Sequence, residues 1–294
     1  MNLTMCKWML LVVVIRLGFG SALHAAEELD AGNPEKERLA AIEQNVGGRL
    51  GVALLDTGNS KRLEYRASEP FPMCSTFKFL AAAEVLSRVD ASQEQLDRRI
   101  SYGEADLLTW APVTAEHVKE GSMTLSDICA AAIEFSDNTA GNLILRTIGG
   151  PEGLTRYLRS LGDRFTRLDR IEPELNTAVE GDERDTTTPA SMLRDLQVLL
   201  LGDKLSATSR QQLEAWLVAN KTGDKRLRAG LPKDWRIGDK TGTGDNAALG
   251  DIAIVRPPNR NPILVVVYTH GSSAPAEKLN EVFSNVGKLI GATF

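Results

Sequence analysis

A serine followed three residues later by a lysine is the first place where this sequence could carry out nucleophilic chemistry. Ser75-Thr-Phe-Lys78 begins an apolar stretch with helical character, so we expect Ser75 at a helix N-terminus with Lys78 on the same face. Free N–H groups at such an end favour developing negative charge. A buried lysine could remove the proton of a serine hydroxyl, which is otherwise a poor nucleophile. The pattern alone also fits an N-cap serine followed by a solvated lysine.

Two further motifs carry polar groups that could bind or protonate a substrate. Ser136-Asp-Asn138 lies between two predicted helices, where the hydroxyl could pass on a proton and the amide could bind a carbonyl group. The same residue types are also ordinary helix N-caps. Lys240-Thr-Gly-Thr243 ends a predicted strand, where the lysine could bind a carboxylate and the glycine would let a ligand approach the backbone.

A second Lys-Thr-Gly sequence, Lys221–Gly223, has to be weighed against the first. It follows a predicted helix over 206–220, and its glycine suits a helix C-cap. We assign function to the copy at Lys240, because a strand presents its residues to a cleft. The stretch 242–247 also mimics a dinucleotide-binding fingerprint, but a strand and not a helix follows it, which argues against nucleotide binding.

The elements that must position these motifs are strands at both ends of the chain with helices between them. The strands follow one another like hairpins, which predicts a mainly antiparallel sheet. We therefore expect an α/β (α+β) fold in which N- and C-terminal helices flank the sheet and an all-helical lobe is inserted. Strands are predicted at 48–56, 62–65, 235–241, 249–255 and 262–269, and helices at 39–46, 76–89, 124–135, 139–148, from 151, 189–201, 206–220 and 275–290.

The first residues have the pattern of a secretory signal peptide. Lys7 precedes the apolar run Trp8–Ile15, and small residues follow near Ala22 and Ala25. The run is shorter than the roughly 20 apolar residues that span a bilayer, so a membrane anchor is the less favoured alternative. Cleavage after residue 25 would leave one domain over 26–294, and we expect the mature protein in the periplasm or secreted. Its sheet lobe would comprise about 26–66 and 221–294, and its helical lobe about 67–220.

Composition excludes several classes of function. The net charge of −5 over 294 residues argues against nucleic acid as a ligand, since nucleic-acid-binding proteins usually carry a basic field. Only three histidines are present, none at ligand spacing from another, and no Cys-x-x-Cys occurs, so we expect no metal and no other cofactor. Cys74 and Cys129 would remain after cleavage. We favour two buried thiols over a disulfide between them.

Five motifs in this order resemble the class A serine β-lactamases and their penicillin-binding relatives. Besides the three motifs above, they include Leu168-Asp-Arg-Ile-Glu-Pro-Glu-Leu-Asn176 and Gly181-Asp-Glu-Arg-Asp-Thr-Thr-Thr-Pro189. The resemblance covers essentially the whole chain after residue 25. It implies hydrolysis of the β-lactam ring of penicillins and cephalosporins through a serine acyl-enzyme, conferring antibiotic resistance. The implied partners are small β-lactam molecules, without nucleic acid or membrane, and we expect a monomer.

The resemblance also implies the catalytic roles. Ser75 would be the nucleophile, Lys78 its immediate partner, and Ser136 the donor of a proton to the departing lactam nitrogen. Glu172 would hold and activate the hydrolytic water together with Asn176. Whether Lys78 or Glu172 is the base for acylation is disputed for this family, and the sequence leaves both open.

Substrate-binding and supporting roles follow in the same way. Asn138 would hold the substrate's side-chain amide, and Lys240 and Thr241 its carboxylate. The backbone N–H groups of Ser75 and Thr243 would form the oxyanion hole. The loop 169–188 would be an Ω-type loop, although a solvated acidic loop is the plain alternative. The remaining implied residues are Gly242 on the binding strand, Arg226 as a guanidinium for the carboxylate, Trp110 at the cleft rim, and the ion pair of Arg170 with Asp185.

Departures from the family pattern limit what can be said of the substrates. Leu249 stands where many members have an arginine, which is why Arg226 is considered for that role. Gly244 occupies the place of the cysteine that many carbapenem-hydrolysing members pair with the equivalent of Cys74. Three rivals share part of the motif set: a cell-wall transpeptidase or carboxypeptidase, a glutaminase of related fold, and a non-catalytic drug-binding module. Glu172 with Asn176 argues against the transpeptidase.

Overall fold

The computed structural model describes residues 32–294, and the predicted signal peptide over 1–25 lies outside the described residues. Its main sheet is antiparallel throughout and has the strand order β2-β1-β9-β8-β7. The two ends of the described chain therefore meet at the centre of one sheet. The five strands are β1 (Arg49–Asp56), β2 (Arg62–Tyr65), β7 (Arg236–Thr243), β8 (Leu249–Arg256) and β9 (Ile263–His270).

The central strands form because their sequences are almost continuously apolar and β-branched. β9 contains the run from Ile263 to Val267 and is buried at every position. The sequence of a strand that is buried on both faces is such a continuous apolar run, and not an alternation of polar and apolar residues. The sheet consequently separates two hydrophobic cores, one on each face.

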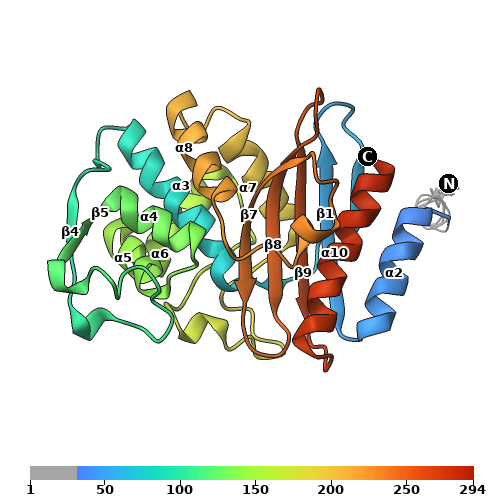
Figure 1. Cartoon of the computed structure of the whole chain (residues 1–294), viewed down its shortest axis with the longest axis horizontal. Helices are drawn as coiled ribbons and strands as arrows, with labels where there is room; N and C mark the ends of the chain where they lie inside the picture. The colour runs from blue at the N-terminus through green and yellow to red at the C-terminus, as the bar shows by residue number, and fades with distance from the viewer. Residues whose placement is uncertain (1–31) are drawn as a thin grey trace, which may run out of the picture.

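The N- and C-terminal helices cover one face of the sheet. α2 (Pro34–Val46) and α10 (Ala276–Thr293) lie side by side against it (Figure 1). Asn33 begins α2 because its side chain accepts hydrogen bonds from the backbone N–H groups of Glu35 and Lys36. Leu39 of α2 and Phe283 of α10 are fully buried in the core on this side.

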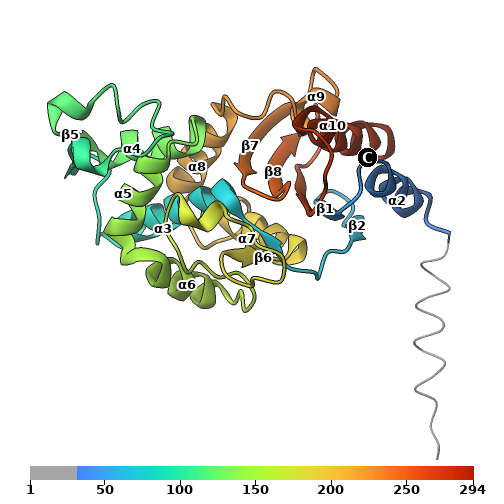
Figure 2. The same ribbon diagram turned by 90° about the horizontal axis from the view of Figure 1, so that it is seen from below.

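The other face of the sheet leads into the helical part of the molecule (Figure 2). α3 (Phe77–Asp90) runs through its centre and buries its first ten residues, Phe77–Leu86. The surrounding helices are α4 (Leu125–Glu134), α5 (Asn138–Ile148), α6 (Gly150–Leu161), α7 (Pro189–Leu200) and α8 (Ala207–Val218), with the short α9 (Leu227–Gly230). The 3-10 turns are η1 (Cys74–Thr76), η2 (Glu104–Asp106), η3 (Val118–Glu120) and η4 (Glu174–Asn176), and two small sheets pair β3 (Phe71–Pro72) with β6 (Thr186–Thr187) and β4 (Arg99–Ser101) with β5 (Ser122–Thr124).

These elements confirm the predicted fold class: helices at both ends of the described chain flank an antiparallel sheet, and a run of helices is inserted between its strands. One local prediction is wrong. α8 ends at Val218 with Ala219 as its C-cap, so Gly223 does not cap the helix. Gly223 instead lies against Asp239, whose carboxylate oxygen would be 1.9 Å from an added Cβ, and only glycine leaves room for this approach.

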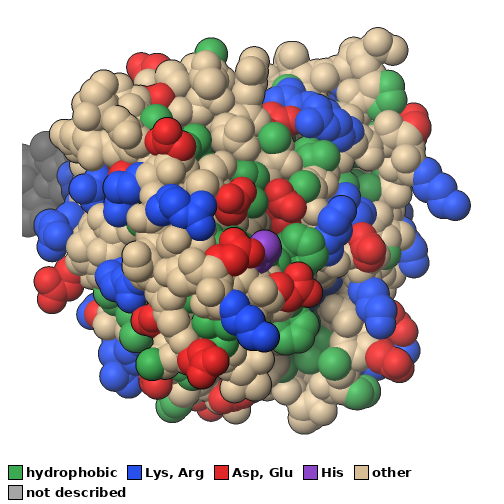
Figure 3. All heavy atoms as spheres, turned by 60° about the vertical axis from the view of Figure 1, so that its left-hand side comes forward, with side chains coloured by type: hydrophobic (Ala, Val, Ile, Leu, Met, Phe, Trp, Pro, Cys, Tyr) green, Lys and Arg blue, Asp and Glu red, His purple; other side chains and the backbone are tan. Residues whose placement is uncertain are grey.

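The described surface carries charges of both signs. On the face turned toward the reader in Figure 3, acidic and basic side chains are intermingled, with hydrophobic side chains among them. The described part of this face is therefore mixed in charge. Within residues 32–294, no helix combines the length and apolar character required to cross a membrane.

Candidate active site

The Ser75 hydroxyl lies at the junction between the sheet and the helical part. Ser75 belongs to η1, which leads directly into α3, and its side chain is buried and lines a cleft. The preceding residue, Cys74, has a φ of 45°, a left-handed conformation that non-glycine residues rarely adopt. Ser75 Oγ lies 3.0 Å from Lys78 Nζ and 3.2 Å from Glu172 Oε1. Two ionisable groups therefore reach the same hydroxyl.

Lys78 is fully buried and ion-paired. Its Nζ lies 2.9 Å from Glu172 Oε1 and donates hydrogen bonds to the Ser136 carbonyl at 3.0 Å and to Asn138 Oδ1 at 2.7 Å. Burial lowers the pKa of Lys78 below its usual value, because desolvation disfavours the ammonium form, and the negative charge of Glu172 opposes this shift. Gly141, one helical turn after Asp137, leaves space for the lysine: an added Cβ there would lie 2.7 Å from Lys78 Cε.

A second buried lysine reaches the same tripeptide from the sheet. Lys240 Nζ on β7 donates to Ser136 Oγ at 3.0 Å and to the Thr241 carbonyl at 2.7 Å. Because Lys240 donates to that oxygen, the Ser136 hydroxyl hydrogen is directed elsewhere. Burial lowers the pKa of Lys240 well below its usual value, and the neighbouring charge of Lys78 adds to the shift. Ser136 itself has a φ of 56°.

Glu172 is held by two asparagines. The Asn142 side chain donates to the Glu172 carbonyl and accepts from the Glu172 N–H, each at 2.9 Å, which ties the loop backbone to α5. Asn176 Nδ2 donates to Glu172 Oε2 at 2.5 Å. Asn176 Oδ1 is buried and has no hydrogen-bond partner among the described residues. A small polar molecule beside Glu172 would find an acceptor there, because buried polar atoms are normally hydrogen-bonded.

The cleft above Ser75 has a volume of about 400 Å³. Trp110 stands at its rim, 55% exposed, with its indole N–H bonded to the Phe135 carbonyl at 3.1 Å. Gly242 lets β7 run close to η1, since an added Cβ would lie 2.6 Å from the Met73 carbonyl oxygen. The cleft is lined by Ser75, Trp110, Ser136, Asn138, Asn176, Thr222, Arg226, Thr241 and Thr243.

Arg226 lies in the wall of this cleft and is tied to the sheet. Its guanidinium donates to the carbonyls of Gly242 at 2.7 Å and Gly250 at 2.6 Å, and to Thr243 Oγ1 at 2.6 Å. Burial lowers its pKa, although the nearby Asp251 carboxylate opposes the shift. The side chain thus lines the cleft as expected, but most of its donors are already used by the protein.

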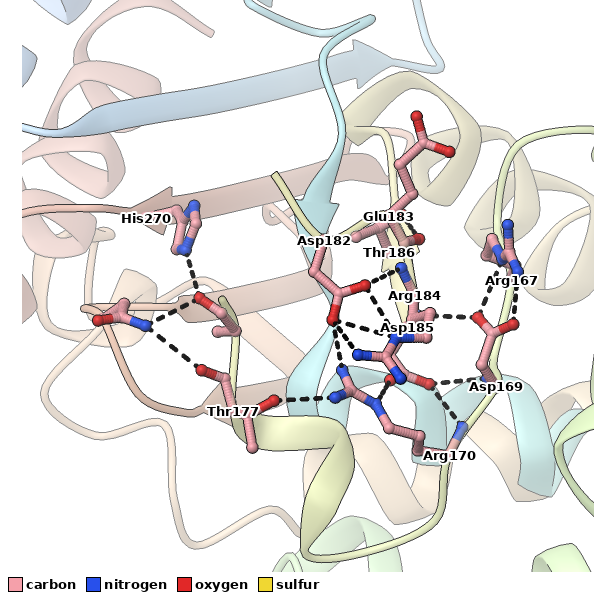
Figure 4. A network of polar contacts seen from close by, with 12 residues as sticks. Arg167, Asp169, Arg170, Thr177, Asp182, Glu183, Arg184, Asp185, Thr186 and His270 are labelled. Carbon is pink, nitrogen blue, oxygen red and sulfur yellow. Dashed lines mark hydrogen bonds and ion pairs between the residues drawn. The ribbon is translucent and has the colours of Figure 1, made fainter. Parts of the chain in front are cut away.

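An ion pair closes the base of the loop that carries Glu172. Arg170 Nε lies 2.5 Å from Asp185 Oδ2, and the Asp185 side chain is fully buried (Figure 4). The other Asp185 oxygen accepts from the backbone N–H groups of Asp169 at 2.7 Å and Arg170 at 2.9 Å. Arg170 also reaches Thr177 Oγ1 at 3.0 Å. The two ends of the loop are therefore joined through the Asp185 carboxylate.

Two residues of this site were missed in the sequence. Thr222, in the Lys-Thr-Gly copy that we set aside, places its hydroxyl 2.5 Å from the Thr241 hydroxyl and lines the cleft. No local signal distinguishes it, because the contact depends on how the loop after α8 folds back on β7. Asn142 could have been found, since it lies four residues after Asn138 and hence on the same face of one helix.

Comparisons with known proteins show the family of this chain. Residues 34–294 match the model of the β-lactamase enzyme family. The chain belongs to this family. It is 45% identical over 254 residues to the β-lactamase OXY-2 of Klebsiella oxytoca, which covers 86% of this chain and 87% of that protein. It is 44% identical over 280 residues to the β-lactamase Toho-1 of Escherichia coli, covering 95% of this chain and 94% of that one.

Solved structures assign the enzyme to class A. An ancestral class A β-lactamase superposes with a TM-score of 0.87 at 58% identity, covering 88% of this chain and all of that one. The putative class A β-lactamase PenP of Rhodopseudomonas palustris gives a TM-score of 0.87 at 51% identity, covering 89% of this chain and 100% of that one. The enzyme is therefore a serine hydrolase of the class A β-lactamases, which open the β-lactam ring and so confer resistance.

Proposed function

We propose that the enzyme hydrolyses penicillins and cephalosporins through an acyl-enzyme on Ser75. The observation that carries this proposal is the contact of one buried hydroxyl with both members of the Lys78–Glu172 ion pair. Such a pair can accept the hydroxyl proton as the oxygen attacks the lactam carbonyl. The backbone N–H groups of Ser75 and Thr243 serve as the oxyanion hole.

Opening of the ring requires a proton on the departing nitrogen. When the lactam C–N bond breaks, Ser136 supplies this proton, because Lys240 donates to its oxygen and leaves its hydrogen free to turn toward the cleft. Ser136 then recovers a proton from Lys240, whose Nζ donates to its hydroxyl oxygen, whereas Lys78 donates to the Ser136 carbonyl. Asn138 binds the substrate's side-chain amide, and Lys240 with Thr241 binds its carboxylate.

Release of the product is the second step. Glu172 removes a proton from water, the water oxygen attacks the ester carbonyl, the bond from that carbon to Ser75 Oγ breaks, and Ser75 takes a proton back from the Lys78–Glu172 pair. Asn176 supports this step because its side chain contacts Glu172 and keeps one buried oxygen free to accept from the water. We further propose that the enzyme is a monomer, and that it acts in the periplasm or outside the cell; the signal-like sequence over 1–25 supports this location.

The intact mass of the protein after mixing with a penicillin tests this mechanism. Replacing Glu172 with glutamine should allow acylation and then stall, since loss of a general base costs about 10²–10⁴ in the step it serves. The spectrum should show protein plus one whole drug molecule, persisting while the wild type returns to its free mass. Glu174→Gln, an exposed acid two residues away, is the matched control. Rapid clearing of the adduct from Glu172→Gln would reject the role of Glu172, and a lasting adduct on the wild type would favour the penicillin-binding rival.

A further inference from the structure

A histidine at the end of β9 contacts the loop that carries Glu172. The His270 side chain is buried, and its Nε2 lies 2.8 Å from the carbonyl oxygen of Ala178 (Figure 4). A carbonyl can only accept a hydrogen bond, so Nε2 carries the hydrogen. The sheet thus donates directly to the backbone of the loop.

The orientation of this imidazole is fixed from its other side. Arg49 Nη2 lies 3.4 Å from Nδ1 of the ring, and since a guanidinium only donates, Nδ1 is the acceptor. Arg49 is itself held by Glu69 at 3.1 Å and lies over the Phe71 ring, 4.7 Å from its centroid. His270 is therefore locked in one tautomer and one rotamer, with its N–H aimed at the loop.

The backbone that His270 holds is in an unfavourable conformation. Ala178 has a φ of 43°, in the left-handed region that costs a residue with a side chain free energy, and it is buried. Such a conformation persists only where surrounding groups impose it. The Ala178 carbonyl also accepts from Asn246 Nδ2 at 3.0 Å, and the same amide reaches the Thr177 carbonyl at 3.3 Å. Donors from β9 and from the β7–β8 turn thus hold this turn of the loop together.

The held turn adjoins a residue of the hydrolytic site. Asn176, two residues before Ala178, donates to Glu172 Oε2, and its backbone carbonyl accepts from Asp245 N at 2.8 Å. We propose that His270 is a positioning residue for deacylation: by fixing the backbone at Ala178, it keeps the Asn176 side chain against the Glu172 carboxylate. This inference rests on the proposed role of Glu172 in the second step.

The effect should fall on the second chemical step more than on the first. Lys78 contacts the Ser75 hydroxyl directly, through η1 and α3, and although it also pairs with Glu172 of the loop, its remaining partners come from the turn at 136–138. Water activation, in contrast, depends on the pairing of Asn176 with Glu172. Loss of one net hydrogen bond to a positioned group corresponds to about a 3- to 10-fold slower deacylation.

The test follows the acyl-enzyme of the full-length mature protein directly. Enzyme in excess is mixed with a penicillin, quenched at successive times, and the formation and decay of the adduct are read by intact mass. In His270→Leu the decay should slow by about 3- to 10-fold while formation keeps its wild-type rate. His270→Gln, whose amide offers N–H donors and a carbonyl acceptor, should restore the decay. A loss of adduct amplitude with unchanged rates would show a merely structural role and overturn the proposal.

Further variants keep the test decisive. Asn246→Gly removes the second donor at an exposed turn while accepting the left-handed φ of 52°, and it should slow the decay as His270→Leu does. Ser272→Ala, which removes a bond to the Val46 carbonyl away from the loop, should decay like the wild type. If the adduct decays normally in both His270→Leu and Asn246→Gly while Glu172→Gln still stalls, the inference about His270 is overturned. If Glu172→Gln also clears normally, the proposed function itself fails.

Discussion

Arg226 donates a hydrogen bond of 2.6 Å to the hydroxyl of Thr243. Because the threonine oxygen accepts from the guanidinium, the hydroxyl hydrogen of Thr243 points away from Arg226. It can therefore point into the cleft that Thr243 lines. We propose that the positive charge acts on a substrate carboxylate through this oriented hydroxyl as well as through space. This arrangement differs from a guanidinium that projects freely into the cleft.

Replacing Arg226 should weaken the turnover of substrates that carry the ring carboxylate. We expect Arg226→Ala to lower kcat/KM by the equivalent of about 1.5–3 kcal/mol, the value of a hydrogen bond to a charged group. Steady-state kinetics with a carboxylate-bearing penicillin measure the effect, and thermal unfolding controls for the lost bonds to the sheet. Thr243→Ala should reproduce part of the loss, whereas unchanged kinetics in Arg226→Ala would mean that Lys240 and Thr241 suffice.

Removing the Ser75 hydroxyl should abolish covalent labelling by penicillin without unfolding the protein. Ser75 makes no helix-capping bond in η1, and even a capping hydroxyl contributes only about 0.5–2 kcal/mol. Mass analysis of peptides after incubation of Ser75→Ala with penicillin checks the labelling, and circular dichroism checks the fold. An acylated peptide elsewhere in the chain, or turnover retained by the variant, would contradict the assignment.

The two cysteines of the described chain should titrate as thiols. Cys74 and Cys129 are both buried and free, and burial raises the pKa of Cys74 to about 12, which keeps it unreactive in the folded protein. A thiol reagent added to the unreduced mature protein should therefore react slowly under native conditions and with two groups after denaturation. A count of zero in the denatured protein would demonstrate a disulfide.

Glu84 should make the stability of the fold depend on pH. Burial raises its pKa to about 7, and one of its oxygens lacks a hydrogen-bond partner. The folded protein therefore binds this proton more tightly than the unfolded chain, and the stability it contributes in acid is lost as pH rises from about 4.5 to about 7. Glu84→Gln cannot ionise and should gain about 1–2 kcal/mol relative to the wild type over this window.

Urea unfolding at pH 5 and pH 8 measures this difference. The comparison of Glu84→Gln with the wild type should favour the variant more at pH 8 than at pH 5. Glu116→Gln, which replaces an exposed carboxylate, serves as the control and should show little change between the two pH values. A pH-independent difference between Glu84→Gln and the wild type would show that Glu84 does not titrate in this range.

The sequence was most informative where a local pattern decides the structure. The apolar runs predicted β1, β8 and β9 to within two residues, because a strand buried on both faces leaves no other pattern. It was least informative where contacts join distant segments. Thr222, in the loop after α8, finds its partner on β7, and His270 finds its partner in the turn at Ala178; neither partner is encoded by spacing along the chain.

The order of the strands also determines how late in synthesis the central strands can pair. The register pairs Arg49 of β1 with His270 of β9, 221 residues apart, while β1 and β2 alone would form a hairpin that is marginal in water. Pairings of such separation slow folding, because the intervening chain must be closed into a loop first. Once β1 has been synthesised, it therefore lacks its principal neighbour, β9, until nearly the whole protein has been made. Premature termination before residue 263 would leave that apolar edge open to aggregation.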